Sequence, residues 1–502
     1  MLLEETFTNN RIVFGHSTRF VIMIISILCL TFVMANSLAL NFTVICMTKP
    51  LAETGISNLN GTNEQEPEPI FSLFEKSWLF SAVAIGQILG TLPITYFTAN
   101  YGVRKTFTAY GLISGFSTFF LPTSVSFGFY FVFLMRVLEG FAMATSFPSL
   151  GSIVAEWSTV KSNGMFIALL SIHLQLGPIF TMPVSGLLCA STYSWPSVYY
   201  LQGGITLFSF IIFYYFYRDS PQIHKHVSQK ELIKITSGKC LVIYTNGKKQ
   251  RQPVPYWKIL KDISVWGIFI SCFGGTFGFQ ILSQYGPTYL NKVLGFDLAK
   301  TGFAAAFPFI LSICFKLIAA PFSDRFTLIS QKARIIMFNS MAQFPMSICL
   351  ILLAVLPTHY TGLIQASYIF AGAFCGLNAV GIAKSIQLIA QQHCHFILAL
   401  NTFIQSTIML ILPPIVSFIA PDNTNEQWGI IFYGIAAIVS ITAIIFNCTA
   451  EASPRPWVTS NGTLEEHEAI TTKEQVIAIP IMETMDKEDS VGHPSPTTPI
   501  FE

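Results

Sequence analysis

Residues 20–47 read FVIMIISILCLTFVMANSLALNFTVICM, a run of 28 residues without a charged side chain. An α-helix rises 1.5 Å per residue, so about 20 apolar residues cross the roughly 30 Å hydrocarbon core of a bilayer. The run therefore predicts a membrane-spanning helix. It is too long for the apolar core of a cleavable signal peptide, so we expect this helix to anchor the chain.

Similar apolar runs recur along the whole sequence. Eleven more are found at 77–98, 106–124, 128–153, 164–189, 197–217, 264–291, 302–322, 335–356, 362–390, 397–419 and 428–448. Charged residues make up only 11% of the chain, against about 25% in soluble domains. These observations predict an all-α membrane protein with 12 transmembrane helices in two halves of six.

The polar segments between the runs divide the chain into five parts. We expect a cytosolic N-terminus at 1–19, an N-terminal six-helix half at 20–217, a cytosolic linker loop at 218–263, a C-terminal six-helix half at 264–448 and a disordered cytosolic tail at 449–502. In the linker, Ser228-Gln229-Lys230-Glu231 has the pattern of a capping box, which predicts a short amphipathic helix at the membrane surface.

Positive charge is distributed unevenly between alternate loops, and basic loops stay in the cytosol. The linker 218–263 holds ten Lys and Arg residues against three acids. The short loops on the same side carry Arg11, Arg19, Arg104, Lys105, Lys161, Arg325, Lys332 and Arg334, whereas the opposite loops carry Glu53, Glu64, Glu66, Glu68, Glu75, Asp422 and Glu426. Both termini are therefore predicted to be cytosolic; plasma membrane, lysosome and vesicle remain equally open.

Two features of the loops and runs concern covalent modification. Asn60-Gly61-Thr62 is an N-glycosylation sequence in the acidic loop after the first helix, on the side where glycosylation occurs. Most of the ten cysteines, Cys189 among them, lie inside apolar runs, and we interpret these as small buried apolar residues.

No sequence motif indicates covalent chemistry or cofactor binding. The sequence contains no metal-ligand spacing, no nucleophile motif, no phosphate-cradling loop and no cluster of aromatic and basic residues typical of nucleic-acid binding. We therefore expect a protein that is not an enzyme, with a lipid bilayer and a small solute as its partners. Two six-helix halves joined by a cytosolic loop resemble the major facilitator transporters, whose solute site lies between the halves near the midplane.

Several longer strings are similar to one family within that group. They are Arg136-Val137-Leu138-Glu139-Gly140, Trp195-Pro196-Ser197-Val198-Tyr199-Tyr200-Leu201-Gln202-Gly203-Gly204, Asp219-Ser220-Pro221, Pro287-Thr288-Tyr289-Leu290 and Val293-Leu294-Gly295-Phe296-Asp297. Together they resemble the anion/cation symporters that include sialin, the vesicular glutamate transporters and the type I sodium–phosphate cotransporters. The string around Lys384 is most similar to invertebrate members. The resemblance implies transport of an organic anion or inorganic phosphate, coupled to a proton or sodium gradient or to membrane potential.

The loops after the second and eighth helices resemble a superfamily motif in which an acid and nearby bases hold one conformer closed. The first copy contains Arg104 but has Ala99 in place of the acid, and the second contains Asp324, Arg325 and Arg334. These residues are candidate gating residues. Ordinary charges that set the orientation of the helices are an equally open interpretation.

Ionisable residues within a predicted membrane span are costly and are functional candidates by default. Arg136 could hold a carboxylate or phosphate through two parallel hydrogen bonds. Glu139 lies three residues on, on the same helical face, and could carry the coupling proton. A purely structural Arg–Glu pair is the alternative.

Other polar residues within the spans are candidates for solute binding. Lys316 and Lys384 could add positive charge to a cavity between the halves, although either lysine could instead extend to the lipid headgroups. His173 could bind a solute or titrate near neutral pH, or be a structural histidine. The remaining candidates are Gln280, Tyr285 and Asn378.

The sequence departs from the family at four positions. Arginines found in several members are replaced by Ala39 and Gly275, a histidine by Phe80, and a carboxylate by Met143. The usual anion clamp of a vesicular glutamate transporter is therefore not expected. Two alternatives stay open, namely a facilitator of a neutral or cationic solute and a non-transporting sensor or scaffold.

Overall fold

All 12 predicted apolar runs form helices in the structure, which is a computed structural model describing residues 17–48, 68–159, 162–237, 244–245, 248–249, 255–325, 329–390 and 393–459. The N-terminal half contains α1 (Thr18–Thr43), α2 (Leu73–Phe127), α3 (Phe129–Met143), α4 (Ser146–Trp157), α5 (Asn163–Leu170), α6 (His173–Ala190) and α7 (Pro196–Phe216). The C-terminal half contains α10 (Ile263–Thr288), the π-helix η3 (Tyr289–Val293), α11 (Leu298–Arg325), α12 (Gln331–Val355), α13 (Thr361–Ala390), α14 (Cys394–Ile419) and α15 (Asn425–Thr449).

Short elements complete the described chain. The linker contains the 3₁₀ turn η2 (Pro221–Ile223), α8 (Gln229–Thr236), a hairpin of β1 (Tyr244–Thr245) with β2 (Lys248–Lys249), and α9 (Tyr256–Leu260). The last helix, α16 (Pro456–Thr459), belongs to a separate C-terminal unit, residues 455–502, whereas residues 1–454 form one unit.

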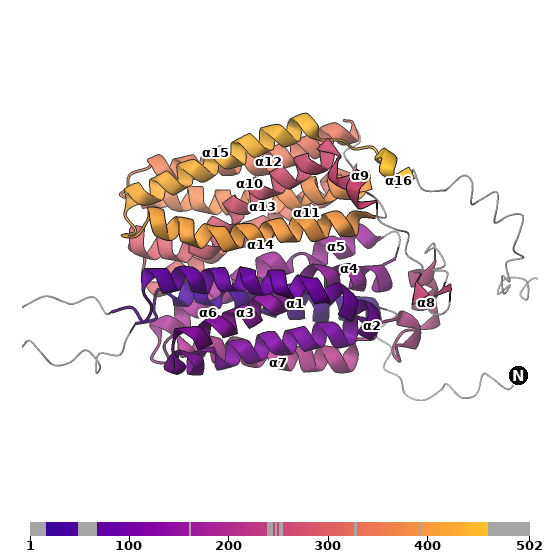
Figure 1. Ribbon diagram of the computed structural model, residues 1–502, viewed down its shortest axis with the longest axis horizontal. Coiled ribbons are helices and arrows are strands. Elements are labelled where there is room, and N and C mark those ends of the chain that lie inside the picture. The colour runs from indigo at the N-terminus through magenta and orange to yellow at the C-terminus, as the bar shows by residue number, and fades with distance from the viewer. Residues whose placement is uncertain are drawn as a thin grey trace, which may run out of the picture. The chain divides into compact units, whose positions relative to one another are not determined.

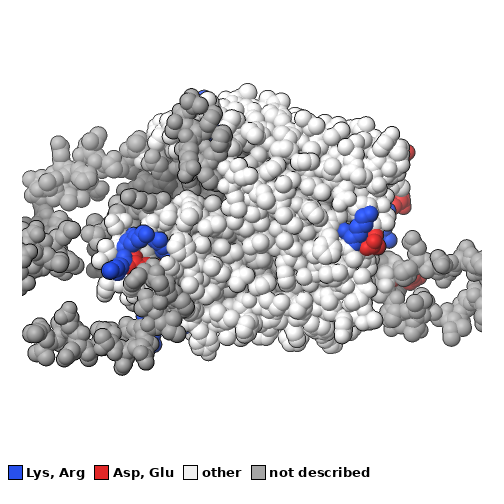
Figure 2. Space-filling model, turned by 180° about the vertical axis from the view of Figure 1, so that it is seen from behind, with Lys and Arg blue, Asp and Glu red and all other residues white. Residues whose placement is uncertain are grey.

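Within the described residues, ten helical segments are long and apolar enough to cross a membrane. The part of α2 after Gly102 and the 30-residue α13 supply the other two membrane-length helices. Figure 1 shows the helices of the N-terminal half, coloured indigo to magenta, packed beside the orange and yellow helices of the C-terminal half. On the face drawn in Figure 2, charged side chains lie near the two ends and the surface between them is uncharged. The predicted fold of 12 transmembrane helices in two halves is confirmed.

Helix α2 contains two of the predicted spans, joined by a sharp bend. Gly102 interrupts the helix with φ +80° and ψ 166°, a conformation that favours glycine because it has no Cβ. Asp219, which follows α7, lies against this bend, and its Oδ1 accepts a hydrogen bond of 2.8 Å from the Arg104 backbone N–H. The carboxylate thus caps the first turn of the helix after the bend.

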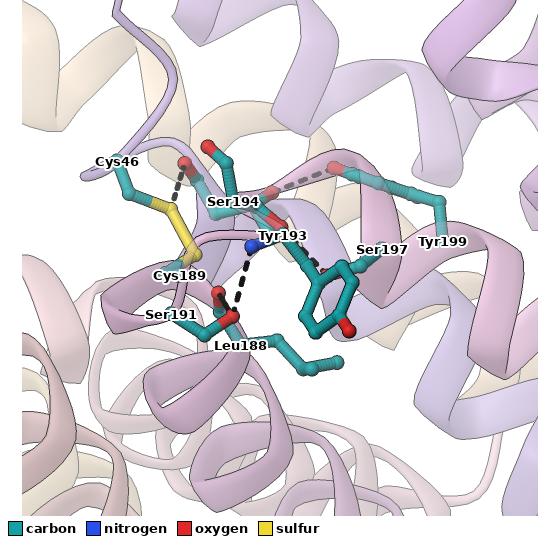
Figure 3. Close-up of a disulfide and its surroundings, with 9 residues drawn as sticks. Cys46, Leu188, Cys189, Ser191, Tyr193, Ser194, Ser197 and Tyr199 are labelled. Carbon is teal, nitrogen blue, oxygen red and sulfur yellow. Dashed lines mark hydrogen bonds between the residues drawn. A yellow bond between two sulfur atoms is a disulfide. The ribbon is translucent and has the colours of Figure 1, made fainter.

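A disulfide joins Cys46, after α1, to Cys189, near the end of α6 (Figure 3). The interpretation of Cys189 as a buried apolar thiol is therefore wrong. Sequence position did not reveal that the ends of two separate helices meet. We call this end of the bundle, marked by Cys46 and Cys189, the disulfide end, and the opposite end, marked by Asp219 and α8, the linker end.

The linker helix α8 is attached to the start of α1. Ser228 caps α8 by accepting the Glu231 N–H at 3.2 Å, as the sequence pattern predicts. The Glu231 carboxylate also accepts the backbone N–H groups of Thr18 at 3.1 Å and Arg19 at 2.9 Å. One acidic residue therefore satisfies two of the free donors at the N-terminus of a membrane helix.

The two halves meet through α6 with α11, α2 with α14, and α1 with α10. Gly186, close to the disulfide end of α6, touches α11: a Cβ at this position would come within 2.7 Å of the Leu298 carbonyl oxygen and 3.1 Å of Gly302 Cα. Small residues allow membrane helices to approach this closely. The halves are thus packed backbone to backbone at the disulfide end.

Candidate functional site

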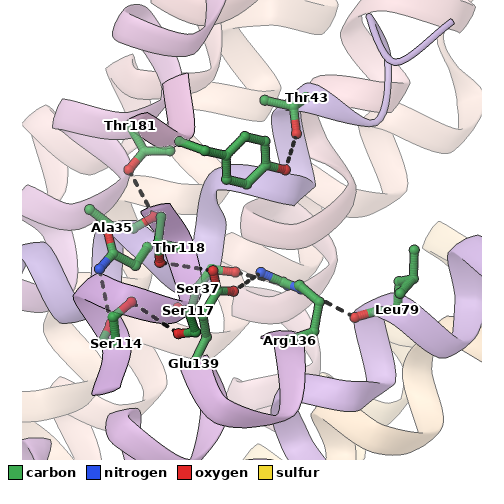
Figure 4. Close-up of polar contacts among 12 residues, drawn as sticks. Ala35, Ser37, Thr43, Leu79, Ser114, Ser117, Thr118, Arg136, Glu139 and Thr181 are labelled. Atoms are coloured by element: carbon green, nitrogen blue, oxygen red, sulfur yellow. Dashed lines mark hydrogen bonds and ion pairs between the residues drawn. The ribbon is translucent and has the colours of Figure 1, made fainter. Parts of the chain in front are cut away.

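Arg136 and Glu139 form a fully buried ion pair on α3. The distance from Arg136 Nη1 to Glu139 Oε2 is 2.6 Å, and both side chains are 0% exposed. Arg136 also donates from Nε to the Leu79 carbonyl at 3.4 Å and from Nη2 to the Ser37 carbonyl at 3.0 Å. Thr118 donates its hydroxyl to Glu139 Oε1 at 2.9 Å (Figure 4). The pair predicted from the three-residue spacing is present, and α1 and both parts of α2 contribute to its surroundings.

The close packing of α2 on α3 fixes the pair. Gly86 and Gly140 both lie where a Cβ would run into the backbone of the other helix, so the helix axes are as near as glycine permits. All three guanidinium nitrogens of Arg136 have protein acceptors in this conformer. An anion would have to displace Glu139 to bind Arg136 in the same geometry.

Lys316 and His173 form a second buried polar group, at the contact of the two halves. Lys316 lies on α11 and His173 at the start of α6; they are 3% and 0% exposed. They are close enough to interact electrostatically. Among the described residues, neither Lys316 Nζ nor His173 Nε2 has a hydrogen-bond partner. An ammonium group buried without a partner is costly, and an anion would offset that cost.

The hydrogen bond at the other ring nitrogen, Nδ1, fixes the tautomer of the neutral His173 ring. His173 Nδ1 lies 2.7 Å from the Leu170 carbonyl oxygen, which can only accept, so Nδ1 carries the proton. In the neutral ring Nε2 is then an acceptor, and in the charged ring it is a donor. His173 can therefore change from repelling an anion's oxygen to binding it by taking up one proton.

Asn378 on α13 occupies the space beside Gly275 on α10. A Cβ at Gly275 would run into Asn378 Nδ2. A side chain at position 275 would therefore require the Asn378 amide to move in this conformer. The asparagine amide supplies a polar group there, and Asn378 Oδ1 is without a hydrogen-bond partner in the described part of the chain.

The other predicted solute-binding residues are placed in different parts of the C-terminal half. Lys384 is half-buried near the end of α13 and interacts with other groups. Gln280 accepts a hydrogen bond from the Ser283 hydroxyl at 3.3 Å. Tyr285 packs edge-on against Phe80 of the other half, with ring centroids 5.2 Å apart. The contacts therefore place the candidates in separate surroundings. Arg136 pairs with Glu139, Lys316 interacts with His173, and Tyr285 packs against Phe80.

The predicted gating residues lie at the linker end. Arg104 donates from Nε to the Tyr214 carbonyl at 2.8 Å, and its guanidinium lies 4.3 Å from the Tyr214 ring centroid. Arg334 is buried at the start of α12 and has interaction partners. Asp324 and Arg325 end α11, but their side chains, like all of Asn60, lie outside the described residues.

Sequence reasoning missed several buried polar groups that have no obvious motif. Asn41 on α1 and Gln284 on α10 are both 1% exposed, and within the described ranges neither side chain has a hydrogen-bond partner. The sequence did contain a signal for them, namely an amide side chain within a predicted membrane span. Such an amide must find a hydrogen-bond partner in protein, water or solute. Their helices, α1 and α10, contact each other across the two halves.

The family model of the Major Facilitator Superfamily matches residues 18–363. The chain belongs to the Major Facilitator Superfamily. Among its relatives, human sialin is 24% identical over 76% of this chain and 76% of its own length. Rabbit (Oryctolagus cuniculus) sodium-dependent phosphate transport protein 1 is 23% identical over 88% and 95%. The uncharacterized transporter slc-17.2 of Caenorhabditis elegans is 23% identical over 91% and 95%.

Solved structures have a similar fold. A D-xylose-proton symporter superposes with a TM-score of 0.63 at 14% sequence identity, covering 86% of this chain and 98% of that one. A bacterial homolog of the human lysosomal transporter Spinster, in an inward-facing and occupied conformation, gives 0.59 at 11% identity over 86% and 96%. These similarities show the fold. The relatives confirm the resemblance to the anion/cation symporters, and they are transporters, not enzymes.

Proposed function

We propose that this facilitator is a secondary active transporter of an organic anion or inorganic phosphate. It works by alternating access, with the two halves rocking about a central site, and is driven by a proton or sodium gradient or by membrane potential. Relatives named as sialin and as sodium-dependent phosphate transport proteins support this solute class.

The observation that carries the proposal is the buried ammonium group of Lys316. It lies on α11, which packs against α6, its charge acts on His173, and among the described residues it has no hydrogen-bond partner. A cationic solute would be repelled there, and a neutral solute would leave the charge uncompensated. A carboxylate or phosphate would accept hydrogen bonds from Lys316 and from protonated His173. This favours an anion over the alternative solutes.

Glu139 is proposed as a second proton-binding group, because its protonation would release Arg136. In this conformer the carboxylate holds Arg136 Nη1 at 2.6 Å. A protonated Glu139 binds the guanidinium less strongly, so an anion can take its place on Arg136. Proton uptake and anion binding would then be linked at one site.

The disulfide supports the proposed orientation. Disulfides form in oxidising compartments outside the cytosol, and Cys46–Cys189 lies at the end opposite the basic linker. The linker end, with both termini, is therefore proposed to be cytosolic. Arg104 and Arg334 at that end are proposed to stabilise one conformer.

The test is uptake into proteoliposomes of labelled phosphate, a panel of labelled carboxylates and, for comparison, labelled neutral and cationic solutes, with and without proton, sodium and potential gradients. Lys316→Met should lower anion uptake at least about tenfold, because a buried charge contact is worth about 2–5 kcal/mol. Lys316→Arg should retain part of it. Lys332→Met is the matched control, because Lys332 is 47% exposed and pairs with Glu451 at the surface.

Two results would overturn the proposal. Wild-type protein that moves none of the anions under any gradient would favour a sensor or scaffold. Uptake of a cationic or neutral solute, unaffected by Lys316→Met, would favour the other facilitator class. Unchanged anion uptake in Lys316→Met would instead leave the transporter in place and move the site elsewhere.

A further inference from the structure

A cavity at the disulfide end lies between the two halves and contains two lysines. Its lining comes from the end of α1, the first turns of α2, the end of α10 with η3, and the end of α14. Lys76 on α2 and Lys292 on η3 line it from opposite halves, and their charges act on each other. The cavity is thus positively charged from both sides.

The other lining groups are suited to binding an anion. Ser77, Thr288 and Asn423 contribute hydroxyl and amide groups, and none of the described lining residues is acidic. Glu75, next to Lys76 in the sequence, is not among the lining residues, and its Oε2 accepts the Ser72 N–H at 2.8 Å and the Ser72 hydroxyl at 2.9 Å as part of the α2 cap. Two ammonium groups that face one cavity repel each other, and an anion between them replaces that repulsion by two attractions.

Lys292 is exposed and lies on an irregular stretch of backbone. The last turns of α10 widen into the π-helix η3 over Tyr289–Val293, and such wide turns are often found at functional sites. Gly295, with φ +67°, ends the segment. The Asn291 side chain holds it by donating to the Phe296 carbonyl at 2.8 Å.

Two aromatic side chains, one from each half, also line the cavity. Phe80 and Tyr285 line the cavity and contact each other across the halves with ring centroids 5.2 Å apart. Phe80 and Tyr285 belong to the same buried apolar cluster as Tyr289 and Met182. Neither Lys316 nor His173 is among the lining residues, so an anion in the cavity would lie at a different place from that pair.

We propose that Lys76 and Lys292 form a second anion site at the disulfide end, separate from the central transport site. It takes a small oxyanion or halide, bound between the two ammonium groups. Because one lysine comes from each half, the bound anion links the halves at this end. It stabilises the conformer in which the disulfide end is closed, and the concentration of anion on that side thereby biases the alternating-access equilibrium.

The experiment measures thermal stabilisation of the purified full-length protein by phosphate and, separately, by chloride, at constant ionic strength. Lys316→Met is used as the background, which removes the ammonium group of the proposed central site. Any anion binding that remains at Arg136 should not respond to substitution of Lys76 or Lys292. We expect a saturable stabilisation that Lys76→Met and Lys292→Met each weaken at least about tenfold in apparent affinity, as for loss of a charged hydrogen bond. Lys76→Arg should retain it. Comparing phosphate with chloride distinguishes a site for the transported oxyanion from one for an inorganic halide.

Lys300→Met is the matched control. Lys300 is exposed near the same end, with Nζ 4.0 Å from the Phe296 ring centroid, and it is not among the lining residues. Stabilisation that falls equally in Lys76→Met, Lys292→Met and Lys300→Met would show general screening of charge and overturn the proposal. So would the absence of saturable stabilisation in the Lys316→Met background. Neither outcome affects the central site, which the uptake assay tests.

Discussion

The substitution Glu139→Gln tests how much the buried Arg136–Glu139 ion pair contributes to stability. Both side chains are 0% exposed and their atoms are 2.6 Å apart, so the substitution leaves a guanidinium charge buried without its counter-charge. Breaking a buried pair in this way costs about 3–5 kcal/mol. The Thr118 hydroxyl also loses a charged acceptor, which adds to the loss in stability.

The assay is thermal unfolding of the purified protein in one fixed detergent, followed by intrinsic fluorescence. Glu75→Gln is the control, because Glu75 is also a carboxylate that accepts from a serine but its hydrogen bonds are exposed. We expect Glu139→Gln to lower the unfolding temperature by several degrees more than Glu75→Gln does. The double variant Arg136→Met with Glu139→Leu should cost less than the sum of the single substitutions, because no charge is left behind.

Equal effects of Glu139→Gln and Glu75→Gln would refute this reasoning. Strict additivity in the double variant would do so as well, since it would mean that the two charges do not interact. A stable Glu139→Gln variant that also binds anions without proton coupling would place Arg136 at an open solute site.

Three further outcomes are expected. Gly186→Leu should separate α6 from α11, because its side chain meets the Leu298 carbonyl. A cysteine introduced near this contact should then react faster with a thiol reagent, and an unchanged rate would contradict the packing described for Gly186. Cys46→Ser should lower thermal stability, by at most about 5 kcal/mol for so large a closed loop, and Cys189→Ser should match it if the two are bonded. Burial lowers the pKa of His224 from 6.5; the fold therefore keeps the neutral ring, stability is complete above pH 6.5, and it falls as the pH drops further, a slope that should be smaller in His224→Gln.

Much of the fold could be predicted from sequence because a lipid environment makes apolar length decisive. All twelve runs are helical, although one run is divided between α3 and α4 and another between α5 and α6. The spacing of Arg136 and Glu139 was enough to predict that they share a helical face. The linker helix after Ser228 was also predictable from its cap. In each case the signal and the structure lie within the same few residues.

The contacts of the candidate site join distant parts of the chain, and they could not be predicted in this way. Nothing near His173 indicates that Lys316 lies beside it, since one is on α6 and the other on α11. The Cys46–Cys189 bond and the capping of the α2 bend by Asp219 are similar cases. Each depends on which helix ends meet, and this follows from packing of the whole bundle.

The contact between Gly275 and Asn378 has a consequence for redesign of the solute site. Because the Asn378 amide lies where a Cβ at position 275 would stand, Gly275→Arg alone has to push that amide aside. A double substitution, Gly275→Arg with Asn378→Ala, removes the obstacle at the same time as it adds the charge. The two positions should therefore be engineered as one unit.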